Sequence, residues 1–149
     1  MSEPTLFDQV GGDRLRTALT DFYDRVFADV MIGYLFAGKN KAHLIEREWE
    51  MTARMLGASA VTYTGRSMRE AHGRHQILGG HFDRRLQLLR DALAAHDVPA
   101  AVCDAIVAHS QALRPQITAD RGSECDHDAA AARTAPTAPE GPVRLGRRG

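Results

Sequence analysis

The sequence YTGRSMREAH occupies residues 63–72 and is followed at once by Gly73. Isolated helices need roughly 12 to 15 residues to be even marginally stable in water, so helical hydrogen bonds alone cannot hold this segment. Coordination of a metal by His72 would fix it, because neutral imidazole is the commonest metal ligand in proteins and a ligand bond offsets the cost of ordering the chain. The alternative is that His72 is a surface histidine in a loop.

The composition restricts the class of protein. A chain of 149 residues is expected to form one domain with a core of its own. Its 19 basic and 19 acidic residues balance, which gives no reason to expect a nucleic acid or a membrane surface as partner. Cys103 and Cys125 do not suggest a disulfide framework, and no apolar run or signal peptide is found. We therefore expect a cytoplasmic protein.

Apolar residues recur at helical spacing in four long segments, without the alternation that is typical of strands. We expect helices after an N-cap at Asp13, over residues 41–56 after an N-cap at Asn40, from about Gly79 to His96, and from Pro99 to about residue 117. Residues 6–12 are expected to form a short apolar turn. The sequence thus predicts an all-α domain over residues 1–118 and a low-complexity, disordered tail over residues 119–149.

Two polar residues lie on or beside apolar stripes. Tyr23 lies beside the stripe of the first helix, so its ring can be buried while its hydroxyl needs a partner. Glu48 occupies a position within the stripe formed by Leu44, Met51 and Met55. Both residues are candidates for a polar group inside a cavity.

Several motifs taken together resemble the truncated (two-over-two) haemoglobins, most closely their first group. The resemblance is collinear from about Thr5 to Thr118, and the motifs that carry it are Phe22-Tyr23, Phe36-Ala37-Gly38, Tyr63-Thr64-Gly65, Met68-Arg69-Glu70-Ala71-His72 and His81-Phe82. It implies a globin-like fold in which two antiparallel helix pairs cross around haem b (iron protoporphyrin IX), with almost no proximal helix. An iron bond to His72 would then explain why so short a segment is ordered.

The resemblance also implies roles for individual residues. His72 corresponds to the proximal histidine that binds the haem iron, and Tyr23 to the distal tyrosine whose hydroxyl stabilises bound oxygen. Phe36 corresponds to the residue that packs on the porphyrin, and Arg47 to a position near the haem edge. Leu44 and Glu48 correspond to positions that face the ligand. The proximal wall corresponds to Met68, Ile77 and Phe82. Because a ligating imidazole directs its other nitrogen to an acceptor, we expect His72 to bond to the carbonyl of Met68 or a neighbour.

The main departure from the family is Glu48, where glutamine is common. A carboxylate only accepts hydrogen bonds, whereas an amide also donates. Three alternatives are open: Glu48 is protonated by burial and donates, it is paired as an ion with Arg47, or it turns to solvent. His75, His81, His96 and His109 are interpreted as solvated or hydrogen-bonded histidines, and His43 is expected to face water.

The expected function is reversible binding of oxygen and other diatomic gases, among them nitric oxide and carbon monoxide, for storage, transfer or sensing. The family also implies nitric oxide dioxygenation, with Tyr23 and Glu48 as catalytic residues. The chain carries no flavin or nicotinamide motif, so an external reductase would be required. The alternatives are a peroxidase-like haem protein that uses Glu48 and Arg47, and a haem-free helical sensor or interaction module.

Overall fold

The computed structural model describes residues 2–73 and 75–119, and within these ranges the chain is helical with no strand. Its elements are α1 (Leu6–Val10), α2 (Gly12–Ala28), the 3₁₀ turn η1 (Gly33–Phe36), α3 (Lys41–Met55), α4 (Met68–His72), α5 (Gly79–Ala95) and α6 (Ala100–Ile117). The expected long helices are α2, α3, α5 and α6, so the all-α prediction is confirmed.

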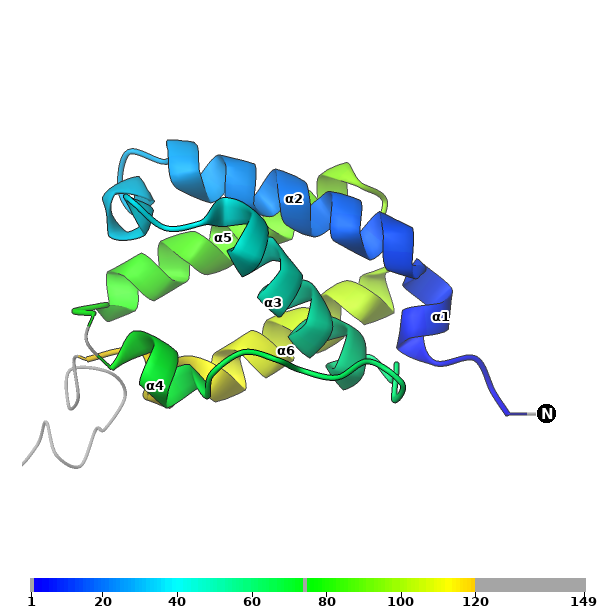
Figure 1. Ribbon diagram of the computed structural model, residues 1–149. Coiled ribbons are helices and arrows are strands. Elements are labelled where there is room, and N and C mark those ends of the chain that lie inside the picture. The colour runs from blue at the N-terminus through cyan, green and yellow to red at the C-terminus, as the bar shows by residue number, and fades with distance from the viewer. Residues whose placement is uncertain (1, 74, 120–149) are drawn as a thin grey trace, which may run out of the picture. The chain divides into compact units, whose positions relative to one another are not determined.

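The long helices pack one on another in the order α3, α2, α5 and α6 (Figure 1). Helix α2 packs against both α3 and α5, α5 packs against α6, and the short α4 lies against α6. The apolar stripes predicted from the sequence face the centre of this arrangement. Most of the largest fully buried side chains come from α2, α5 and α6, and Ile32 adds one from the segment before η1: Phe22, Phe82, Leu15, Leu19, Ile32, Leu89, Leu93, Val26 and Val102.

The start of α2 differs from the prediction. The N-cap is Gly11 rather than Asp13, and residues 6–10 form the helix α1 instead of an apolar turn. Gly11 has a φ of +79°, a conformation that glycine adopts readily. The same residue is therefore both the C-cap of α1 and the N-cap of α2. Thr5 and Asp8 close a capping box that stabilises α1.

Other predicted helix ends agree with the structure. The Asn40 side chain caps α3 by accepting a hydrogen bond from the His43 N–H at 3.1 Å. After α6, the N–H of Ala119 donates to the carbonyl of Ile77 at 2.8 Å, which ties the end of the described chain to the segment before α5. The tail predicted for residues 119–149 lies, beyond Ala119, outside the described residues. No helix in the described ranges is long and apolar enough to cross a membrane.

Glu50 anchors the loop that leads to α4. This α3 residue is 7% exposed, and its carboxylate accepts hydrogen bonds from the Thr64 N–H at 3.0 Å and the Thr64 hydroxyl at 2.9 Å. Arg47, one turn earlier on α3, donates to the same carboxylate at 3.1 Å. Burial alone would raise the pKa of Glu50, but the hydrogen bonds from Thr64 and the charge of Arg47 outweigh it, and the pKa lies below its usual value.

We predict that Glu50→Gln lowers the free energy of unfolding by about 1–3 kcal/mol, because the loop N–H and hydroxyl lose a charged acceptor. The native pKa of Glu50 is depressed, so its contribution is fully present above about pH 4.3 and is lost as the pH falls through the native pKa. Urea denaturation of both proteins from pH 7 to pH 3 should therefore show the difference shrinking with acid.

Glu46→Gln is the matched control on α3. Glu46 forms an ion pair with Arg16 at 2.6 Å, but both side chains are 42% exposed, so this change should cost less than about 1 kcal/mol. Equal effects of the two substitutions would show that Glu50 does not anchor the loop.

Candidate functional site

A cavity of about 480 Å³ lies among the long helices, η1 and α4. This volume falls within the range of about 300–1,000 Å³ that is typical of cofactor and small-molecule sites. The cavity is lined by every site residue predicted from the sequence: Tyr23, Phe36, Leu44, Arg47, Glu48, Met68, His72, Ile77 and Phe82. The fold thus brings together residues that lie far apart along the chain.

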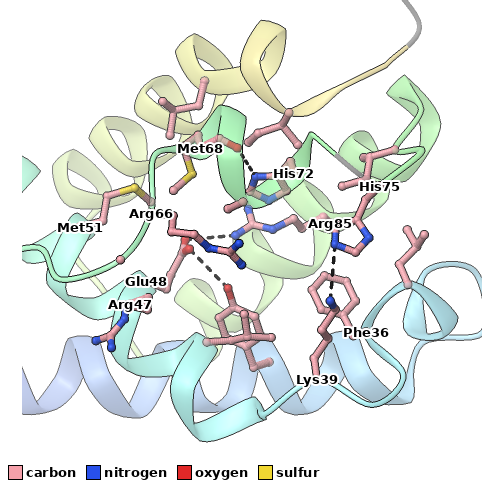
Figure 2. A pocket seen from close by; sticks show the side chains of 18 of the residues that line it. Phe36, Lys39, Arg47, Glu48, Met51, Arg66, Met68, His72, His75 and Arg85 are labelled. Atoms are coloured by element: carbon pink, nitrogen blue, oxygen red, sulfur yellow. Dashed lines mark hydrogen bonds and ion pairs between the residues drawn. The ribbon is translucent and has the colours of Figure 1, made fainter.

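His72 is the last residue of α4, and its imidazole is tied to the same short helix. The Nδ1 atom lies 2.7 Å from the carbonyl oxygen of Met68 (Figure 2). A carbonyl can only accept, so Nδ1 carries the proton and Nε2 keeps its lone pair. Burial lowers the pKa of His72, which also favours the neutral ring. The predicted bond to the Met68 carbonyl is confirmed, and the imidazole is in the form that a metal ligand requires.

Tyr23, Glu48 and Arg85 form a polar cluster in the cavity wall, one residue each from α2, α3 and α5. The Tyr23 hydroxyl donates to Oε2 of Glu48 at 3.4 Å. Nη2 of Arg85 donates to Oε1 of Glu48 at 3.2 Å (Figure 2). Burial raises the pKa of the Tyr23 phenol, and the negative charge of Glu48 raises it further. Burial alone would lower the pKa of Arg85, but the charge of Glu48 together with the hydrogen bonds to Tyr23 and Glu48 outweighs it, and the pKa lies above its usual value. The phenol is therefore protonated and the guanidinium charged.

The alternative in which Glu48 pairs as an ion with Arg47 is wrong. Arg47 donates to Glu50 at 3.1 Å, and its Nη2 atom lies 2.7 Å from Nε2 of His43. Adjacent residues on a helix point about 100° apart, whereas residues three apart lie on the same face, so Arg47 meets Glu50 and not Glu48. His43 is exposed, as expected.

The other two alternatives for Glu48 are also decided by its contacts. The side chain is 11% exposed and lines the cavity, so Glu48 does not turn to solvent. Both carboxylate oxygens accept hydrogen bonds, one from Arg85 and one from Tyr23. Glu48 is therefore an acceptor in this structure, and the interpretation as a neutral donor is not supported.

Arg85 is the site residue that the sequence reasoning missed. It lies three residues after Phe82 and four before Leu89, so helical spacing places it beside the apolar stripe of α5. A charge beside an apolar stripe was the signal in the sequence that could have identified Arg85.

The other histidines were interpreted as hydrogen-bonded or solvated. His81 lies 3.2 Å from the Tyr34 hydroxyl, and His96 lies 3.0 Å from Asp21, which confirms the interpretation for these two residues. Residues 2–73 and 75–119 contain no cluster of three or more metal-binding side chains.

Aromatic and apolar side chains form the rest of the cavity. Phe36 in η1 packs against Phe27 and Tyr23, with ring centroids 5.7 Å and 6.5 Å apart. Lys39 and Arg66 also line the cavity and are exposed, and Lys39 Nζ lies 3.5 Å from Nε2 of His75. The cavity thus combines an apolar interior, a neutral imidazole and exposed cations.

The family model and the relatives that match this chain all belong to the globins. A family model described as bacterial-like globin matches residues 5–119. The chain is 33% identical over 118 residues to a group 1 truncated haemoglobin of Mycolicibacterium paratuberculosis, which covers 78% of this chain and 86% of that protein. A group 1 truncated haemoglobin of Tetrahymena thermophila is 29% identical over 92 residues, covering 61% and 75%.

Solved structures have the same fold. The truncated haemoglobin of Tetrahymena pyriformis in its Fe(III) form aligns with a TM-score of 0.68 at 24% identity, covering 76% of this chain and 97% of that chain. The 2/2 haemoglobin of Synechococcus in the cyanomet state aligns with a TM-score of 0.67 at 22% identity, covering 75% and 94%.

The ion pair between Glu48 and Arg85 can be tested by a double-mutant cycle. We expect Glu48→Leu and Arg85→Leu each to lower the free energy of unfolding by about 1–3 kcal/mol, because each substitution leaves a largely buried charge unpaired. Removal of one partner from a fully buried ion pair costs more, about 3–5 kcal/mol. The double substitution should cost less than the sum of the single ones. Urea denaturation of the four proteins measures the coupling, and strict additivity would show that the two residues do not interact.

Proposed function

Since this chain belongs to the bacterial-like globin family, and among these to the group 1 truncated haemoglobins, we propose that His72 is the protein ligand of its haem iron. The chain is a haem protein that binds gases such as oxygen, as its family implies. Haem b supplies an iron atom that binds diatomic ligands reversibly. The observation that carries the proposal is the bond from His72 Nδ1 to the Met68 carbonyl, which leaves Nε2 available in a cofactor-sized cavity.

The cavity residues fit this cofactor. Haem b is a flat, largely apolar ring that carries two carboxylate groups, and the cavity offers apolar walls together with the exposed cations Lys39 and Arg66. Phe36 and Phe82 would pack on the ring, with Leu44, Met68 and Ile77 as further apolar contacts. The Met68 carbonyl would orient the imidazole and increase its basicity through Nδ1. The apolar walls would exclude water from the ligand.

We predict that His72→Ala abolishes the Soret band of the purified protein after hemin is supplied, because the iron loses its protein ligand. His75→Ala is the matched control, since His75 also lines the cavity but bonds to Lys39. This variant should keep the band. A band that is retained in His72→Ala and lost in His75→Ala would assign the iron to the other histidine.

We further propose that the protein converts nitric oxide to nitrate with bound oxygen, using an external reductase to return the iron to the ferrous state. The polar cluster supports this reaction, because the charged guanidinium of Arg85 can stabilise the negative charge that develops on oxygen. The peroxidase-like alternative relied on Glu48 acting with Arg47. It loses support, because Arg47 bonds to Glu50 and both oxygens of Glu48 are occupied by hydrogen bonds.

Stopped-flow mixing distinguishes the two activities. We predict that nitric oxide converts the oxygen-loaded ferrous protein to the ferric form with a second-order rate constant at least about tenfold above that of the ferric protein with hydrogen peroxide, a difference of about 1.4 kcal/mol in activation free energy. A faster reaction with peroxide, lowered by Glu48→Gln, would favour the peroxidase-like activity.

A further inference from the structure

The polar cluster contains few protons that are free to reach a ligand. The Tyr23 hydroxyl has a single proton, and the structure directs it to Oε2 of Glu48 at 3.4 Å. The carboxylate of Glu48 has none to give, since both of its oxygens accept. Tyr23 therefore cannot donate to a ligand without breaking its bond to Glu48.

Arg85 has N–H donors that its bonds within the cluster do not use. A guanidinium carries five N–H donors in a rigid plane; the bond from Nη2 to Glu48 uses one of them, and a hydrogen bond with the Tyr23 hydroxyl uses another. The side chain is 20% exposed and lines the cavity. The planar group is fixed from two sides, by Glu48 on α3 and by the ring of Phe22 on α2, whose centroid lies 4.9 Å from Cζ. A cationic donor with little freedom thus faces the cavity.

We infer that Arg85 is the residue that donates to the ligand and determines which ligands the site prefers, while Glu48 keeps the proton of Tyr23 turned away. This inference rests on the proposed function. The pair of Glu48 and Arg85 is neutral as a whole, so the preference arises from the N–H groups that point away from Glu48. The site therefore favours ligands that carry negative charge, such as small anions on the ferric iron, over the weakly polar carbon monoxide.

The test compares variants of the haem-loaded full chain. Ferric protein is titrated with azide by visible absorbance, and the C–O stretching frequency of the ferrous carbon monoxide form is read by infrared spectroscopy. Arg85→Met should weaken azide binding about tenfold to hundredfold, the range of a charge-assisted hydrogen bond, and should raise the C–O frequency because the positive charge is removed. Arg90→Met is the control, since it removes an arginine from an exposed position of α5.

Tyr23 provides the second comparison. Tyr23→Phe should change azide affinity by less than about threefold in the wild-type background, because its proton is held by Glu48. In the Glu48→Gln background the same change should have a larger effect, since the phenol proton is no longer directed to a carboxylate. This dependence on Glu48 is not expected of a tyrosine that only packs in the wall.

Three results would overturn the inference. The first is an unchanged azide affinity and C–O frequency in Arg85→Met together with shifts in Tyr23→Phe, which would make Tyr23 the donor. The second is an Arg85→Met protein that holds haem weakly but binds azide with unchanged affinity at the haem that remains; Arg85 would then hold the cofactor and not the ligand. The third is a wild-type protein that shows no spectral response to azide, in which case the proposed iron site fails as well.

Discussion

The hydrogen bond between His72 Nδ1 and the Met68 carbonyl is the interaction on which the site depends. It lies within α4, a helix of five residues that is far too short to be stable by itself. The helix is positioned from outside, by its packing on α6 and by the Glu50 carboxylate that holds the preceding loop at Thr64. A buried carboxylate on α3 therefore helps to position the imidazole of His72 by holding the loop that leads to α4.

In the part of the cavity wall formed by Tyr23, Glu48 and Arg85, the polar groups hydrogen-bond to one another. Tyr23, Glu48 and Arg85 come from three helices, and each of their hydrogen bonds crosses from one helix to another. Such a cluster is weak support for stability, since desolvation of the two charges opposes their attraction. Three apolar side chains could fill the same wall. The cluster is better explained by what it offers to a ligand than by what it adds to the fold.

Sequence reasoning succeeded where the signal was local. The helical periodicity predicted the four long helices, and the motifs around Tyr23 and His72 identified the lining of the cavity. It failed where two helices meet, because the crossing of α3 and α5 decides that Glu48 reaches Arg85, and no spacing along the chain encodes that crossing. The start of α2 was missed because a glycine with positive φ ends one helix and begins the next, so the polar residue that follows is not needed as a cap.

Glu48 and Arg85 depend on each other in this wall. A lone carboxylate in this wall would lack a cation, and a lone guanidinium would lack an anion, so each residue is unfavourable without the other. Together they leave the charge of the wall at zero but replace an amide donor with a guanidinium. The charge of Glu48 and the hydrogen bonds to Arg85 keep the pKa of Arg85 high in spite of burial, so this donor stays protonated across the physiological pH range. The wall therefore offers a charged N–H donor in place of a neutral amide, and hydrogen bonds from a charged donor are the stronger kind.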